Sequence, residues 1–91
     1  MLVRTASYWN YPRERELHAL LEREFDFPYF HGRNWDAFWD AVTGLVEIPD
    51  HVRFVGWVTL LERVPAGGRM LRLQLDRCRN EYRSDLLIEY V

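Results

Sequence analysis

Two aspartates, Asp36 and Asp40, are the residues of this chain whose types and spacing best suit chemistry. A separation of four positions on an α-helix brings both side chains to one face, where they would present two carboxylates together. Such a pair can transfer protons as a general acid and base, or it can imitate phosphates and enter a cationic site of another molecule. Asp suits the second use because its short side chain loses little rotamer freedom when it is fixed.

Catalysis is the less favoured use of the two carboxylates. No nucleophile, oxyanion donor or cofactor motif accompanies them, so the sequence predicts a protein that is not an enzyme. The three histidines, His18, His31 and His51, do not have the spacing of metal ligands, and we expect neither a metal nor a cofactor. The residues alone also fit a simpler alternative, in which Asp36 and Asp40 belong to a solvated helix face with an acidic start.

The charges of the chain are nearly balanced but unevenly distributed. Twelve arginines and no lysine accompany 14 acidic residues, which gives a net charge of −2. Residues 34–52 carry four acids and no base, whereas residues 53–91 carry seven arginines interleaved with five acids. A protein that binds nucleic acid through its phosphates needs a stronger basic surface, so direct nucleic-acid binding is a less favoured alternative.

Length and composition predict one domain over residues 1–91, because a chain of this size builds a single hydrophobic core. The single cysteine, Cys78, excludes a disulfide framework and is expected to be a small core residue. No signal peptide is recognisable at the start, and the longest nearly apolar run, residues 55–61, is too short to span a membrane. We therefore expect a cytoplasmic protein that does not contact membranes and is monomeric when free.

The two aspartates are predicted to lie on a helix that Asn34 caps. At 100° per residue, one side of this helix is apolar and should face the core; it comprises Trp35, Phe38, Trp39, Val42 and Val46. Of these, Trp35 and Phe38 are expected to be buried.

The same helix is predicted to carry two further stripes, the first on the flank of the apolar side and the second beyond it. The acidic stripe comprises Asp36, Asp40 and Thr43, and beside it lies a strip of small residues, Ala37, Ala41 and Gly44. Another backbone could approach such a strip closely. Gly44 also suits the C′ position that ends a helix.

The rest of the chain alternates between short apolar segments and longer amphipathic ones. We expect strands over residues 2–6, 52–58 and 86–91, and a helix that starts at Asn10-Tyr11-Pro12 and ends before Pro28. On this helix, His18 is expected to be a core histidine. One or two helical turns are expected over residues 59–64.

Residues 66–82 fit two structures. Leu71, Leu73 and Leu75 alternate as in a strand. A helical stripe is also present, and length and charge favour the helix; the stripe comprises Gly67, Leu71, Leu75, Cys78 and Tyr82. The resulting order predicts an α/β fold, in which about four helices cover a small three-stranded parallel sheet. Because the strands are apolar rather than alternating, they are expected to be buried.

The stretch FPYFHGRNWDAFWDAVTGLVE, residues 27–47, resembles the barstar family of intracellular ribonuclease inhibitors. The matched features are Pro28, Phe30, Gly32 and Asn34, then Asp-Ala-x-Trp-Asp at residues 36–40 and Thr-Gly-x-Val-Glu at residues 43–47. A weaker likeness in pattern covers most of the chain. The resemblance implies a three-stranded parallel sheet with four helices, which agrees with the prediction from the hydrophobic pattern.

The resemblance also implies a function, which is stoichiometric inhibition of a secreted, guanyl-preferring ribonuclease of the barnase type. The helix of Asp36 and Asp40 and the loop before it would enter the nuclease active site, with Asp40 in the place of a substrate phosphate. The partner-binding residues implied in this way are Phe30, His31, Gly32, Arg33, Asn34, Asp36, Ala37, Asp40, Thr43 and Gly44.

This sequence departs from the family pattern at three places. Phe30 and His31 stand where the family has paired tyrosines, and Leu45 stands where it has a tryptophan. The family also contributes an acid from its last helix, for which this chain offers Asp76 or Glu81. The departures bear on which partner is bound, and they leave open an alternative, an immunity or regulatory protein for a different toxin.

Overall fold

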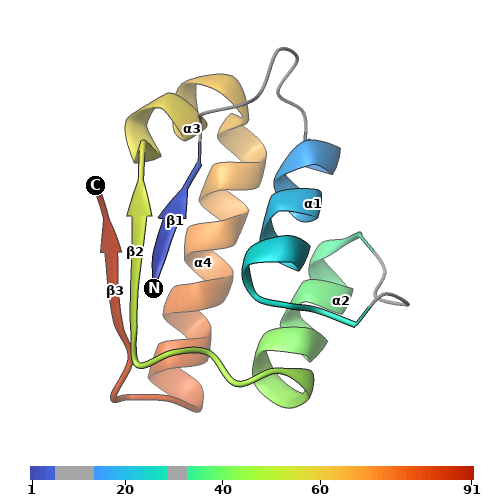
Figure 1. Ribbon diagram of the computed structural model, residues 1–91, viewed down its shortest axis with the longest axis vertical. Helices are drawn as coiled ribbons and strands as arrows, with labels where there is room; N and C mark the ends of the chain where they lie inside the picture. Colours follow the sequence, from blue (N-terminus) through green and yellow to red (C-terminus); the bar gives the residue numbers. More distant parts are fainter. Residues whose placement is uncertain (6–13, 29–32) are drawn as a thin grey trace.

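The computed structural model describes residues 1–5, 14–28 and 33–91 (Figure 1). The elements follow in the order β1 (Leu2–Arg4), α1 (Glu14–Glu24), α2 (Trp35–Asp40), a π-helical turn η1 (Ala41–Leu45), β2 (His51–Val55), α3 (Trp57–Arg63), α4 (Pro65–Glu81) and β3 (Leu87–Tyr90). The expected helix start at residues 10–12 and the loop residues Phe30, His31 and Gly32 lie outside the described residues.

The three strands form one parallel sheet, as predicted, and their order in the sheet is β1-β2-β3. The register pairs Val3 with Phe54 and Val52 with Ile88. These four side chains are buried and are the contribution of the sheet to the hydrophobic core. In Figure 1, α1, α2 and α4 gather on one side of the sheet. The α/β fold class is therefore confirmed.

The expectation of fully buried strands is wrong, because burial alternates along β1 and β2, and β3 begins with an exposed residue. Arg53 of β2 and Leu87 of β3 are exposed on the face that the helices do not cover. Arg53 forms an ion pair with Glu89 there at 3.5 Å, and the Nε2 atom of His51 lies 3.4 Å from the same carboxylate. Alternation is the usual pattern of a sheet with one solvated face, and the polar residues His51 and Arg53 at the exposed positions of β2 were its signal in the sequence.

β2 is shorter than the expected strand over residues 52–58 because the backbone turns at Gly56. The φ angle of Gly56 is 85°, a left-handed conformation that glycine adopts without steric cost. Gly56 caps α3, and Trp57 becomes the first residue of that helix. The Trp57 ring is buried and lies 4.6 Å from the ring of Tyr90, measured between centroids.

Residues 65–81 form the helix α4, so the favoured prediction for this segment is confirmed. Gly67, Leu71, Leu75 and Cys78 lie on its buried face, whereas Leu73 is 61% exposed. Tyr82, which the predicted stripe included, follows the last residue of the helix and is 63% exposed. α4 also packs closely against α1, since a Cβ added at Gly67 would lie 3.0 Å from the buried Leu17 side chain. His18 of α1 is buried as well, as expected.

Within the described parts of the chain, no helix is long and apolar enough to cross a membrane. The same residues contain no group of three or more side chains that could hold a metal ion.

Candidate functional site at the acidic helix

The start of α2 is fixed by Asn34, which acts as the predicted N-cap. Its backbone is extended, and its side-chain oxygen accepts a hydrogen bond from the Ala37 backbone N–H at 2.8 Å. This bond satisfies one of the N–H groups that the first helical turn leaves without a partner. The cap therefore sets where α2 begins and, with it, which side chains the helix exposes.

Asp36 and Asp40 are both exposed on α2, as the sequence predicted. Neither carboxylate forms an ion pair or a side-chain hydrogen bond with any residue that the structure describes. Asp36 lies in the first turn of the helix, where the helix dipole favours a negative charge. The two charges are thus held by a short capped helix and remain available to a partner molecule.

The helix does not continue regularly to Gly44, which corrects the prediction. From Ala41 the chain forms a π-helical turn, in which the Val46 backbone N–H donates to the Ala41 carbonyl at 3.0 Å. The Thr43 hydroxyl also donates to the Trp39 carbonyl, at 2.6 Å. The wider turn changes the angular spacing after Asp40, so Thr43 does not continue an α-helical stripe. Gly44 is exposed inside this turn and does not end a helix as a left-handed C′ residue.

The predicted strip of small residues is also wrong. Ala41 is fully buried and packs in the core with Phe38 and Val42, so it cannot contact another molecule. The buried side of this helix therefore extends beyond its large apolar residues. It includes Ala41, because a small side chain on the flank of the helix can pack against the core. Ala37 is half-buried and Gly44 is exposed, but they do not form a continuous strip.

The apolar side of α2 reaches the core only in part. Phe38 is fully buried, as expected, but Trp35 and Trp39 are half-buried. The indole N–H of Trp35 donates to a Glu14 carboxylate oxygen at 2.5 Å. An indole at the edge of the core can pack its ring and keep its N–H on a polar partner, which explains the partial exposure.

Arg33 precedes the cap and is tied to α1. Its guanidinium forms an ion pair with Glu22 at 3.2 Å. Arg33, Asn34 and Trp35 line one side of a hollow of about 320 Å³. The other lining residues of this hollow, Glu14, Arg15 and His18, belong to the first turns of α1. The structure therefore brings Arg33 and Asn34 close to α1, a proximity that the sequence did not predict.

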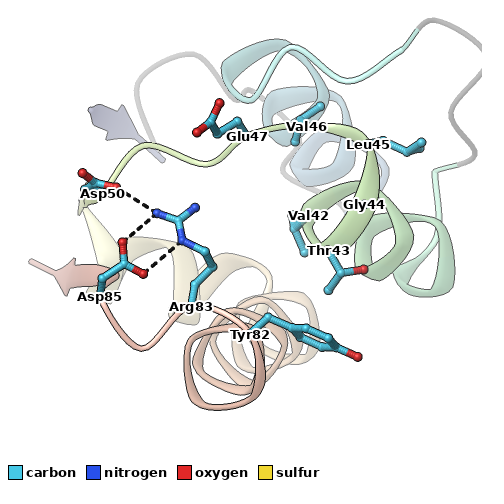
Figure 2. Close-up of a pocket in the computed structure, with 10 residues that line it drawn as sticks. All are labelled: Val42, Thr43, Gly44, Leu45, Val46, Glu47, Asp50, Tyr82, Arg83 and Asp85. Carbon is cyan, nitrogen blue, oxygen red and sulfur yellow. Dashed lines mark hydrogen bonds and ion pairs between the residues drawn. The ribbon is translucent and has the colours of Figure 1, made fainter.

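A larger depression, of about 660 Å³, lies between η1 and the end of α4 (Figure 2). Its lining residues are Val42, Thr43, Gly44, Leu45, Val46, Glu47, Asp50, Tyr82, Arg83 and Asp85. Thr43 and Gly44 were predicted to belong to the site, but Tyr82, Arg83 and Asp85 were not. No local signal in the sequence could have identified these three, because they approach η1 only when α4 packs against α2.

Arg83 joins three segments at one end of this depression. Its guanidinium binds both oxygens of Asp85 at 3.1 Å, Asp50 at 2.8 Å and the Ile48 carbonyl at 3.0 Å. The hydrogen bond from Arg83 lowers the pKa of Asp85 below its usual value and raises the pKa of Arg83 itself. The network connects the end of α4 to the segments that precede β2 and β3.

We expect this network to make folding stability sensitive to acid. A carboxylate with a lowered pKa stabilises the fold above its unfolded pKa, near 4, and loses that contribution as the pH falls through the folded value. Asp85→Asn should therefore lower the unfolding midpoint in urea at neutral pH and have little effect near pH 2.5. Glu62→Gln, an exposed change on α3, is the matched control and should be neutral at both pH values. An equal loss for Asp85→Asn at both pH values would contradict the assignment.

The choice between Asp76 and Glu81 depends on which side of α4 each occupies. Asp76 accepts a hydrogen bond from the Tyr90 hydroxyl at 2.9 Å and therefore faces β3. Glu81 accepts a hydrogen bond from Arg77 at 3.1 Å, and the Arg77 guanidinium lies 4.4 Å from the centre of the Trp39 ring on α2. Glu81 is thus the acid of the two that lies on the α2 side of α4.

Comparison with known proteins agrees with this architecture. A sequence model of the family described as "Barstar (barnase inhibitor)" matches residues 1–85. A protein of Bacillus subtilis (strain 168) named "Putative ribonuclease inhibitor YrdF" is 52% identical to this chain over 33 residues. That match spans 36% of this chain and 36% of the length of the relative.

Proposed function

The chain belongs to the barstar family, and from this membership and the exposed carboxylates of α2 we propose that it is a ribonuclease inhibitor. Its partner would be a guanyl-preferring nuclease of the barnase type, whose active site it blocks. The observation that carries the proposal is the pair Asp36 and Asp40, which are exposed on a capped helix and free of partners among the described residues. The name of the Bacillus subtilis relative supports the same role.

The proposed mechanism is imitation of the substrate. A nuclease that cleaves a phosphodiester surrounds the phosphate with cationic groups, which stabilise the charge that develops during cleavage. Asp40 would occupy the position of a phosphate, and Asp36 would lie beside it. Because the inhibitor offers no bond for the nuclease to cleave, it would remain bound, and inhibition would be stoichiometric. This role needs no catalytic group and no cofactor in the inhibitor.

We propose that the surface in contact with the nuclease includes the predicted residues Phe30, His31, Gly32, Arg33, Asn34, Asp36, Ala37, Asp40, Thr43 and Gly44. In this proposal, residues 1–91 act as one domain, monomeric when free and cytoplasmic. The inhibitor would protect the cell that produces the nuclease.

A titration tests the proposal directly. The protein is added in increasing amounts to barnase and to other secreted guanyl-preferring ribonucleases at fixed concentration, and the rate of RNA cleavage is measured. We expect the activity of at least one nuclease to fall linearly and to end at one inhibitor per nuclease. Unchanged cleavage by every nuclease at a severalfold excess of the inhibitor would overturn the proposal.

One observation favours a second candidate, an immunity protein for a different toxin. Leu45, which stands at the family's tryptophan position, is 54% exposed at the edge of the depression beside α2. A smaller apolar side chain there would fit a partner of different shape. Inhibition of a toxin that does not cleave RNA, with every ribonuclease unaffected, would favour this candidate.

A further inference from the structure

We propose that Glu22 of α1 is a positioning residue for inhibition, which holds the guanidinium of Arg33 and keeps its positive charge away from the acidic surface of α2. Glu22 is not among the residues proposed to contact the nuclease, so it would act only through Arg33. This inference rests on the proposed function. It assigns to α1 a role in a surface that α2 presents.

Arg33 is the arginine nearest in the sequence to the two carboxylates of α2. It precedes the cap Asn34 and lies three positions before Asp36, whereas the next arginine along the chain is Arg53. A free guanidinium at this place would oppose binding in two ways. It would repel the cations of a nuclease active site, and it would compete with them for the Asp36 carboxylate.

In the structure, Arg33 is paired with an acid of another helix. Its Nε donates to Oε2 of Glu22 at 3.2 Å. Among the described residues, Arg33 forms no other hydrogen bond or ion pair, and the Asp36 carboxylate forms none. The pair with Glu22 therefore explains why Asp36 remains free although an arginine lies three positions away.

The surroundings of Glu22 make it a suitable anchor for this arginine. Its side chain is 22% exposed, whereas that of Arg33 is 45% exposed. The Phe27 backbone N–H donates to the Glu22 carbonyl at 2.9 Å, and the preceding residue, Leu21, is fully buried in the core. The backbone at Glu22 is thus fixed, and a pair formed at a partly buried carboxylate is screened less by salt than a fully exposed one.

A second acid of α1 holds the other side of the cap. The indole N–H of Trp35 donates to a Glu14 carboxylate oxygen at 2.5 Å, and the Trp35 ring lies 4.4 Å from the ring of His18. The two residues that flank Asn34 are therefore both bound to α1. Because these contacts exist in the free protein, less conformational freedom is lost when the start of α2 binds a partner.

The test removes the negative charge of Glu22 and measures inhibition of the ribonuclease that the unmodified protein inhibits most strongly in the titration above. Glu22→Gln should weaken inhibition about 10-fold at low salt, because Arg33 is then free to pair with Asp36 and to repel the nuclease. At about 1 M salt the loss should shrink to about 2-fold, since the repulsion is screened. Thermal unfolding of each variant shows whether it remains folded.

Two further variants separate the effect of charge from an effect on the fold. Glu24→Gln removes one acid from the same helix, but Glu24 pairs with Arg23 at 3.6 Å, so inhibition should change less than about 2-fold. Arg33→Gln combined with Glu22→Gln removes the freed charge and should recover most of the loss. A residue that only supports the fold would show neither this recovery nor the dependence on salt.

The outcomes distinguish this inference from the proposed function. If the unmodified protein inhibits a ribonuclease and Glu22→Gln inhibits it as strongly as Glu24→Gln does, the role of Glu22 is overturned while the proposed function stands. A loss that arises from unfolding, or that Arg33→Gln does not recover, would overturn this role as well. If the unmodified protein inhibits none of the nucleases, the proposed function fails and this inference fails with it.

Discussion

Asp40→Ala should weaken inhibition of the nuclease about a thousandfold, which corresponds to about 4 kcal/mol of binding free energy. In the proposed complex, Asp40 is desolvated among the cations that normally hold a phosphate. Truncation of its side chain leaves those cations buried without a counter-charge, and an unpaired buried charge is costly. In the free protein Asp40 is exposed and has no partner among the described residues, so its loss should change the free energy of unfolding by only about 0.5 kcal/mol.

The controls for this experiment follow from the structure. Asp36→Ala should give an intermediate loss, because Asp36 lies beside Asp40 on the same helix. Asp50→Ala removes the same charge from a turn, but Asp50 accepts a hydrogen bond from Arg83 at 2.8 Å, so this variant also disturbs the fold. Glu62→Ala on α3 is the cleaner control, since Glu62 is exposed and forms no ion pair with the described residues.

Inhibition and thermal unfolding should be measured on each variant. If Asp40→Ala inhibits as strongly as the unmodified protein, Asp40 does not imitate a phosphate. A loss that is explained by unfolding of Asp40→Ala would refute the proposal equally, because the effect would then arise in the free protein. Equal losses for Asp40→Ala and Glu62→Ala would show that only net charge matters.

The association rate with a basic nuclease should fall on the order of a hundredfold between low salt and about 1 M salt. Of the four acids in residues 34–52, Asp50 is paired with Arg83. The other three, Asp36, Asp40 and Glu47, create a field that attracts a basic cleft during encounter. Added salt screens this field over roughly 8–10 Å at moderate ionic strength and over about 3 Å at 1 M. The dissociation rate should change much less, because charges in the formed complex are shielded from the solvent ions.

Stopped-flow measurement of both rates across the salt series tests this prediction. The double variant Asp36→Asn with Asp40→Asn should show a shallower salt dependence, whereas Glu62→Gln should keep the slope of the unmodified protein. An association rate that is flat across the series would show that the acidic segment does not steer the partner. A salt dependence that appears only in the dissociation rate would contradict the prediction as well.

Local signals in the sequence were sufficient for the fold class and for the acidic helix. Apolar segments separated by amphipathic ones predicted the three parallel strands and the helices, and Asn34 marked the start of α2 correctly. The exposure of Asp36 and Asp40 followed from helical spacing. Each of these features depends either on a residue and its near neighbours or on the periodicity of apolar residues. Both kinds of information can be taken directly from the sequence.

The sequence was less informative where packing or backbone geometry overrides the helical pattern. The regular helical spacing of 100° per residue predicted that Ala41 lies on an exposed strip. In the structure its small side chain is buried in the core at the flank of the helix. The π-helical turn after Asp40 and the left-handed Gly56 that shortens β2 also changed the expected boundaries. Neither is specified by residue type, since alanine, valine, threonine and glycine occur in regular helices and strands as well.

The sequence by itself determined that this protein presents two carboxylates on a capped helix, because a cap and a spacing of four residues are local properties. Only the tertiary structure decided what surrounds that helix. The packing of α4 against α2 brings Arg77 and Tyr82 next to Trp39, and Arg83 next to Asp50, across more than thirty positions of the chain. Such contacts depend on how the helices pack on one face of the sheet, and the type of a residue does not indicate which distant residue it will contact.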